Sequence, residues 1–183
     1  MSQLLEKIQT AETFSNTIDA LNDYKDGLIN LDRVWQVACL DLARQVNCTR
    51  TSVWIFNKLQ DRIDCLALYD DRFGHFESGA RLQEEDFPTY FQAIRTGQTV
   101  IAVDAMSHPY TAEFAHSYFE PNSIDSLLDH IVMSNGMPVA VICCEHCGGL
   151  MSWTPYQERS LIQASELLAE AFKVAKANHS SRF

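Results

Sequence analysis

The sequence has few basic residues for its length. Its 183 residues include 14 lysines and arginines against 24 aspartates and glutamates, which gives a formal net charge of −10. A protein of that charge repels phosphate backbones and anionic lipid headgroups. The sequence also lacks any apolar run of the roughly 18 residues that suggest a membrane-spanning helix. We therefore expect neither nucleic acid nor membrane among the partners of this chain.

The first ten residues lack both the basic segment and the apolar segment of a secretory signal. In the absence of such a signal, the six cysteines indicate reduced thiols rather than a disulfide framework. Both observations predict a cytoplasmic location.

Helical patterns occupy both ends of the chain. Apolar residues recur at steps of three and four across residues 4–21, and a second helix is expected over residues 30–47. Near the C-terminus, Thr154, Pro155 and Gln157 combine an N-cap, a proline at the first helical position and a capping-box glutamine. A long final helix is therefore expected to start there.

The middle of the chain carries β-rich runs of strand length. Strands are expected at residues 51–58, 62–70, 99–104, 126–134 and 137–146, with a short helix over residues 87–97. The last two strands flank Asn135-Gly136, the preferred pair for a tight hairpin turn. Residues 105–123 form a long loop, and loops of that length are often functional lids.

This order of elements predicts an α+β fold. We expect one mostly antiparallel sheet with the N- and C-terminal helices on one face and the loop, with a short helical piece, as a lid over the other.

Residues 141–149, VICCEHCGG, collect metal-ligating and redox-active residue types. Successive strand residues point to opposite faces, so Cys143 and Glu145 share one face while Cys144 lies on the other. A second pair of ligands at zinc-finger spacing is absent. Cys144 and Cys147 form a CxxC pair, but no helix N-terminus follows to lower the pKa of the first thiol. We therefore expect no metal site and no catalytic cysteine.

A central strand explains most of this stretch more simply. The face with Ile142 and Cys144 would pack under the terminal helices, and the face with Cys143 and Glu145 would line a cavity or the lid loop. A buried carboxylate must be paired, hydrogen-bonded or neutralised. Glu145 is thus expected either to accept hydrogen bonds from the lid loop or to contact a ligand.

Together these features resemble a GAF domain, of the sensory type found in bacterial diguanylate cyclases and histidine kinases. Residues 140–148 read AVICCEHCG, close to the pattern small-Val-x-Cys-x-Glu-His-x-Gly that ends the sheet in that subgroup. The loop DAMSHP from Asp104, the residue Tyr118 and the stretch SLLD from Ser126 also fit. Met151 stands where the subgroup usually has arginine.

The resemblance covers residues 28–177. It leaves residues 1–27 as an N-terminal helix for dimerisation or signalling and residues 178–183 as a C-terminal tail. It implies a non-catalytic sensory module that binds a small ligand between sheet and lid. The signal would then pass through the terminal helices of a homodimer to an output domain or a partner signalling protein. In the final helix, the residues of one stripe from Leu161 to Ala175 are separated alternately by four and three positions. This heptad-like spacing favours such a dimer.

The expected ligand-binding residues lie on the short helix, the lid loop and the last hairpin. They are Tyr90, Asp104, Phe114, Tyr118, Ser126, Leu128, His130, Cys143 and Glu145. The ligand is left open as a small organic molecule, with neither metal nor haem expected.

Two alternatives remain. Stand-alone GAF proteins can reduce free methionine sulfoxide with cysteines, although the Gly-Val-Cys-Gly motif of those enzymes is absent here. The chain could also be a dimerisation domain without a ligand.

Overall fold

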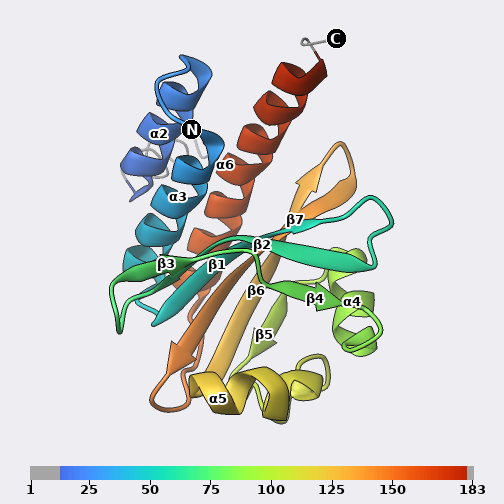
Figure 1. The fold of residues 1–183 in the computed structure, drawn as a ribbon. Helices are drawn as coiled ribbons and strands as arrows, with labels where there is room; N and C mark the ends of the chain where they lie inside the picture. The colour runs from blue at the N-terminus through green and yellow to red at the C-terminus, as the bar shows by residue number, and fades with distance from the viewer. Residues whose placement is uncertain (1–12, 181–183) are drawn as a thin grey trace.

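A seven-stranded antiparallel sheet forms the centre of the computed structural model, which describes residues 13–180 (Figure 1). Its strands lie in the order β3-β2-β1-β7-β6-β5, and β4 pairs with the other end of β2. The strands are β1 (Arg50–Phe56), β2 (Arg62–Asp70), β3 (His75–Glu77), β4 (Arg81–Gln83), β5 (Val100–Ala102), β6 (Ile124–Ser134) and β7 (Met137–Cys147).

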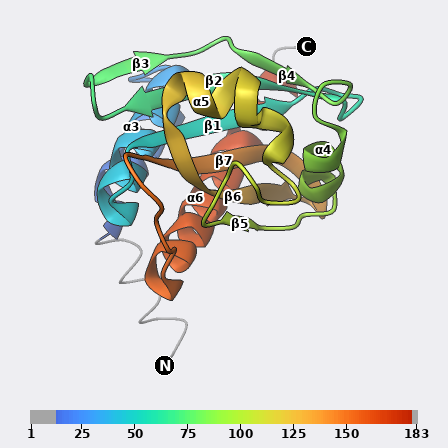
Figure 2. The same cartoon turned by 90° about the horizontal axis from the view of Figure 1, so that it is seen from below.

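Helices cover both faces of the sheet. On one face lie α2 (Ser15–Lys25), α3 (Leu31–Val46) and α6 (Pro155–Ser180), as Figure 1 shows. The other face carries α4 (Pro88–Arg95) and a run of three short helical turns, seen from below in Figure 2. These turns are η1 (Ala112–Phe114), η2 (Ala115–Phe119) and α5 (Glu120–Asn122), and we call them together the lid segment. The predicted α+β class and layer arrangement are confirmed.

The helix ends follow the predicted capping chemistry. The Asn30 side chain accepts a hydrogen bond from the backbone N–H of Arg33, which satisfies one of the free amides at the start of α3. At α6, Oε1 of Gln157 accepts from the backbone N–H of Thr154 at 2.8 Å. Nε2 of Gln157 also donates to the carbonyl of Val46 at 2.7 Å, so this cap joins α6 to the end of α3.

Two hydrophobic cores lie on opposite faces of the sheet. Ile142 and Cys144 pack in the helix-side core with α3 and α6, whereas Val141 and Cys143 pack in the lid-side core with α4 and the lid segment. The predicted division of this strand between two faces is confirmed. The apolar stripe of α6 is also used within the chain: Leu161, Leu168 and Ala175 are buried, and Phe172 stacks on Trp35 with ring centroids 4.6 Å apart.

Several boundaries differ from the sequence-based expectation. Strands β3 and β4 were not expected, because these three-residue strands are largely exposed and show no apolar alternation. The 105–123 loop contains helical turns, as expected, although three of them follow one another over residues 112–122. Helix α6 continues to Ser180, past the expected start of the C-terminal tail at residue 178, and no glycine or proline follows Pro155 to end it earlier. The start of the expected N-terminal helix, residues 4–12, lies outside the described residues.

Among the residues described, no helix has both the length and the apolar character needed to cross a bilayer.

Candidate functional site

A small cavity lies in the lid-side core, between the sheet and the lid segment. Its volume is about 20 Å³, which is enough for one water molecule. Aromatic and aliphatic side chains from β1, β2, β4, α4, β6, β7 and the lid segment make most of its wall. Two carboxyl groups, of Asp129 and Glu145, interrupt this apolar wall.

Five of the nine predicted ligand-binding residues line this cavity. They are Tyr90, Phe114, Tyr118, Cys143 and Glu145. They come from α4, η1, η2 and β7, so the fold brings together residues that are up to 55 positions apart in the sequence. Their role in binding a ligand stays a prediction.

Three predicted residues on β6 lie on the other face of the sheet. In the ladder between β6 and β7, Leu127 lies opposite Glu145 and Asp129 lies opposite Cys143. Residues directly opposite one another share a face, so Leu127 and Asp129 face the cavity. Ser126, Leu128 and His130 therefore face the helix side and do not line this cavity, in contrast to the expected arrangement.

A β-bulge explains this error. The hairpin turn forms as predicted, with positive φ at both Asn135 and Gly136, and pairs Ser134 with Met137. An unbroken register from that pair would place Leu128 opposite Cys143. The register instead shifts between Val132 and Met133, and a shift of one residue reverses the face on which every later side chain lies.

The residues outside the cavity have structural roles. Ser126 Oγ donates to the carbonyl of Val103 and accepts from the backbone N–H of Met151. Nδ1 of His130 lies 2.7 Å from Oγ1 of Thr99. Asp104 does not line the cavity either, because its carboxylate accepts hydrogen bonds within its own turn, from the Met106 N–H and the Ser107 hydroxyl.

Asp129 is the charged cavity residue that the sequence-based list missed. Its side chain is fully buried, and Oδ2 accepts a 2.6 Å hydrogen bond from the hydroxyl of Tyr90. Its other oxygen, Oδ1, has no hydrogen-bond partner. Burial raises the pKa of this carboxyl to about 7, although the hydrogen bonds from Tyr90 and Cys143 oppose the rise. A charged residue in the middle of the apolar run LLDHIV was the sequence signal that could have identified it.

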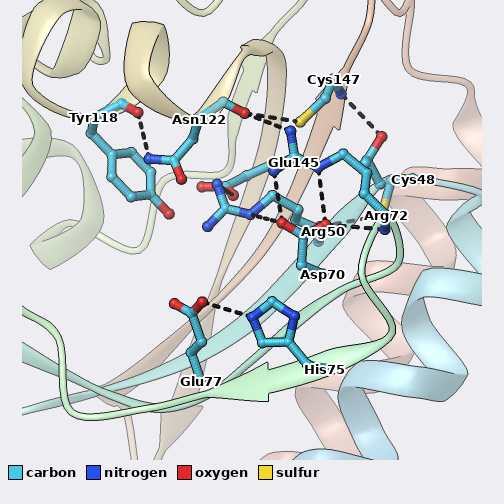
Figure 3. A network of polar contacts seen from close by, with 11 residues as sticks. Cys48, Arg50, Asp70, Arg72, His75, Glu77, Tyr118, Asn122, Glu145 and Cys147 are labelled. Carbon is cyan, nitrogen blue, oxygen red and sulfur yellow. Dashed lines mark hydrogen bonds and ion pairs between the residues drawn. The ribbon is translucent and has the colours of Figure 1, made fainter.

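Glu145 is paired with an arginine from the neighbouring strand, as Figure 3 shows. Nη1 of Arg50 lies 3.4 Å from Oε2 of Glu145, and both side chains are only 4% exposed. The same guanidinium reaches Asp70, with Nε 3.3 Å from Oδ2. Burial raises the pKa of Glu145, and the charge of Arg50 opposes that rise. The expectation that lid-loop amides or a ligand would satisfy Glu145 omitted this ion pair.

The ion-pair network continues to the lid segment. Arg72 holds Asp70 through a 2.7 Å contact and donates from Nη1 to the carbonyl of Asn122 at 2.9 Å. Nδ2 of Asn122 in turn donates to the carbonyl of Tyr118 (Figure 3). The C-terminal end of the lid segment is thereby tied to the strands that carry the buried charges.

Tyr118 lies over this network from a turn of π-helix, a conformation that is frequent at functional sites. The guanidinium carbon of Arg50 is 5.6 Å from the centre of the Tyr118 ring. The phenol hydroxyl is buried and has no hydrogen-bond partner. Burial, and next the nearby Glu145, raise the pKa of Tyr118 well above its usual value, so the hydroxyl stays protonated.

The N-terminal end of the lid segment is fastened to α4. Both carboxylate oxygens of Glu113 accept from the backbone N–H of Thr89, at 3.1 Å each, and Oε2 also accepts from the N–H of Tyr90 at 3.3 Å. An anion at a helix N-terminus satisfies amides that have no partner within the helix. Glu113 and Asn122 thus hold the two ends of the lid segment.

The cysteines are poor nucleophiles. Cys143 and Cys144 are buried, and burial raises both of their pKa values well above the usual range. Burial also raises the pKa of Cys147 to about 11. In the part of the chain that the structure describes, no three metal-ligating side chains converge.

The comparisons with known proteins agree with the geometry. The family model described as GAF domain matches residues 30–172. The sequence matches no curated protein.

Solved structures with the same fold come from several bacterial proteins. The chain is similar to the GAF domain of a phosphoenolpyruvate-protein phosphotransferase from Coxiella burnetii, with 13% identity over 93% of this chain and 98% of that one and a TM-score of 0.68. It is equally similar to free methionine-R-sulfoxide reductase from Neisseria meningitidis, solved with its substrate, with 13% identity over 92% and 91% of the two chains and a TM-score of 0.68. The chromophore-binding domain of Stigmatella aurantiaca bacteriophytochrome shares 11% identity over 90% of this chain and 60% of that one, with a TM-score of 0.64. At such identities the likeness concerns the fold alone.

Proposed function

The chain belongs to the GAF domain family, and on that premise we propose that it is a non-catalytic sensory module. A small ligand binds in the cavity between the sheet and the lid segment. Binding changes the position of the lid segment, and the sheet passes this change to the terminal helices on its other face.

The observation that carries this proposal is a set of buried polar atoms without hydrogen bonds at the cavity. Oδ1 of Asp129 and the hydroxyl of Tyr118 lack a hydrogen-bond partner, and Oε2 of Glu145 forms a 3.4 Å ion pair with Arg50 but no hydrogen bond. Leaving such groups unsatisfied costs about 1–3 kcal/mol each, and unsatisfied groups in native proteins call for an explanation. A ligand with complementary polar groups supplies one.

The fold supports a relay from lid to helices. Neighbouring residues on β6 and β7 alternate between the two cores: Leu127 contributes to the lid-side core, and Leu128 to the helix-side core. A movement of these strands that follows the lid therefore alters the packing against α3 and α6. The chain would act in the cytoplasm as a homodimer through its terminal helices and signal to an output domain or a partner protein.

Calorimetric titration with a panel of small metabolites tests the proposal. We expect at least one saturable ligand, whose affinity falls about tenfold or more in Tyr118→Phe, because the lost hydroxyl is one of the unsatisfied groups. Glu145→Gln should also weaken binding, whereas Glu77→Gln on the exposed strand β3 should leave it unchanged. If no compound binds, or if Tyr118→Phe binds as the unaltered protein does, this cavity is not the sensory site.

A thiol-dependent reductase is the competing function, since one structurally similar protein is a free methionine-R-sulfoxide reductase. The raised pKa values of Cys143 and Cys144 leave almost no thiolate near neutral pH, which opposes nucleophilic chemistry. Turnover of an oxidised metabolite with added thiol, abolished by Cys144→Ser or Cys147→Ser, would replace the sensory proposal.

A further inference from the structure

The charges around the cavity do not balance if every carboxyl group is ionised. Arg50 and Arg72 are matched by Asp70 and Glu145 through the ion pairs of the network. Asp129 is the remaining carboxyl group, and among the described residues no cationic side chain forms an ion pair with it. A single ionised carboxylate in an apolar interior is costly, so Asp129 needs either a proton or a cation.

The unsatisfied atoms call for a hydrogen-bond donor. Oδ1 of Asp129 is an acceptor without a hydrogen bond, and the hydroxyl of Tyr118 can accept as well as donate. Oε2 of Glu145 forms an ion pair with Arg50 at 3.4 Å and can still accept a hydrogen bond. These three residues contribute to one cavity wall. A group with several N–H donors and a positive charge is complementary to all three.

The rest of the cavity wall also favours a cation. Trp54, Tyr90, Phe114 and Tyr118 line it, and the negative faces of aromatic rings attract cations. We propose that this cavity recognises the primary ammonium group of a small amine, which contacts Asp129, Glu145 and the Tyr118 hydroxyl. This inference rests on the proposed function, because it names the ligand class of the same site.

Size and coordination distinguish an ammonium group from a metal ion. The cavity of about 20 Å³ accepts a group the size of a water molecule, so the ammonium head fits and a larger amine would displace the lid segment. Calcium takes six to eight oxygen ligands, and the described residues contain no cluster of three metal-ligating side chains.

Binding should exchange a cation for a proton. The titratable groups that face Asp129 are Tyr90 from α4, Cys143 and Glu145 from β7, and Tyr118 from the lid segment. Tyrosine and cysteine keep their protons near neutral pH here, and Glu145 is paired with Arg50. The pKa of Asp129 is about 7, so below that pH an incoming ammonium group displaces the carboxyl proton to solvent. Affinity should therefore rise about tenfold from pH 6 to pH 8.

An NMR titration with methylammonium chloride tests the inference, and the indole N–H of Trp54, a cavity residue, serves as the reporter. We expect a saturable shift of this signal, with about tenfold tighter binding at pH 8 than at pH 6. Asp129→Asn, which keeps an oxygen for the Tyr90 hydrogen bond, should bind at least tenfold more weakly and lose the pH dependence. Asp104→Asn removes the same charge outside the cavity and should bind normally.

Methanol and potassium chloride are the control titrants: methanol is a neutral molecule of similar size to methylammonium, and potassium chloride supplies a metal cation. The inference fails if either produces the same saturable shift, or if methylammonium produces none. It also fails if binding is independent of pH in the unaltered protein, a result that does not depend on the folding of any variant. If a neutral or anionic metabolite binds and Tyr118→Phe abolishes this binding, the ammonium proposal is overturned, but the proposal of a sensory cavity is supported. The absence of binding by every compound would overturn both.

Discussion

Arg50 compensates two buried carboxylates from a position that is itself almost inaccessible to solvent. It contacts Glu145 at 3.4 Å and Asp70 at 3.3 Å, and the side chains of all three residues are no more than 6% exposed. Arg72 also pairs with Asp70, but it forms no ion pair with Glu145. Glu145 therefore depends on Arg50 alone for an opposite charge within 4 Å, as far as the described residues go.

Replacing Arg50 by methionine should lower the free energy of unfolding by about 3–5 kcal/mol, the usual cost of removing one partner from a buried ion pair. Chemical denaturation measures this loss. Arg81→Met is the matched control, because Arg81 forms a similar contact with Asp64 while its side chain is 69% exposed; it should cost less than about 1 kcal/mol. Equal losses in the two variants would mean that the buried network contributes no more than a surface pair.

Single residues also mark the limit of what the sequence could predict. A glutamate in an apolar strand is recognisable, because a buried carboxylate is rare, and Glu145 was identified on that ground. Arg50 begins a strand and looks like an ordinary boundary residue. Its importance depends on the pairing of β1 with β7, which places Arg50 opposite Glu145 across 95 positions of sequence. Strand order is a property of the whole sheet and leaves no local pattern.

At the scale of elements, the lid segment is held at its N-terminal end by the carboxylate of Glu113. This side chain accepts three hydrogen bonds from the first amides of α4. The next residue, Phe114, stacks on Phe87 with ring centroids 4.0 Å apart and contributes to the cavity wall. The contact that fastens the lid segment and the contact that closes the cavity are thus adjacent in the chain.

Glu113→Ala should loosen the lid segment at a cost of about 1 kcal/mol, typical of a lost helix cap. Hydrogen exchange should become several-fold faster in residues 112–122 and at the Thr89 amide, while α3 and α6 keep their protection. Glu120→Ala is the control, since Glu120 lies in the same segment and its carboxylate pairs with the exposed side chain of His116. Faster exchange throughout the chain would show general destabilisation instead of a local fastening.

The elements themselves were largely predictable, and the exceptions have a common cause. Periodicity and capping residues identified α3, α6, the β6–β7 turn and the division of β7 between two cores. The register shift between Val132 and Met133 of β6 comes from one extra residue on β7, Val139, which lies between the paired Pro138 and Ala140. It was not predictable from alternation, because residues 138–142 are all apolar and suit either face. That one extra residue decided whether Leu128 or Asp129 reached the cavity.

For the whole molecule, the sheet separates two cores with different contents. The helix-side core is continuous from α2 to α6, whereas the lid-side core contains the cavity and the unsatisfied polar atoms. Ligand binding on one side and subunit contact on the other would therefore use separate surfaces connected by the strands. The stripe on α6 that favoured a dimer from sequence is consumed inside the chain, so a dimer through these helices must use the outer surface of α6.

Ile162 is an exposed aliphatic residue of α6, with 39% of its surface accessible in the single chain. If the terminal helices pair as proposed, Ile162→Lys places a charge in an apolar contact, and sedimentation velocity should show a shift from dimer to monomer at the same concentration. Leu59→Lys is the control, because Leu59 is 78% exposed and lies on the β1–β2 turn, not on a terminal helix, and should leave the dimer intact. The proposed dimer interface is contradicted if the unaltered protein is a monomer, or if Leu59→Lys disrupts the dimer and Ile162→Lys does not. In either case the terminal helices do not form the interface, and the relay must end within one chain.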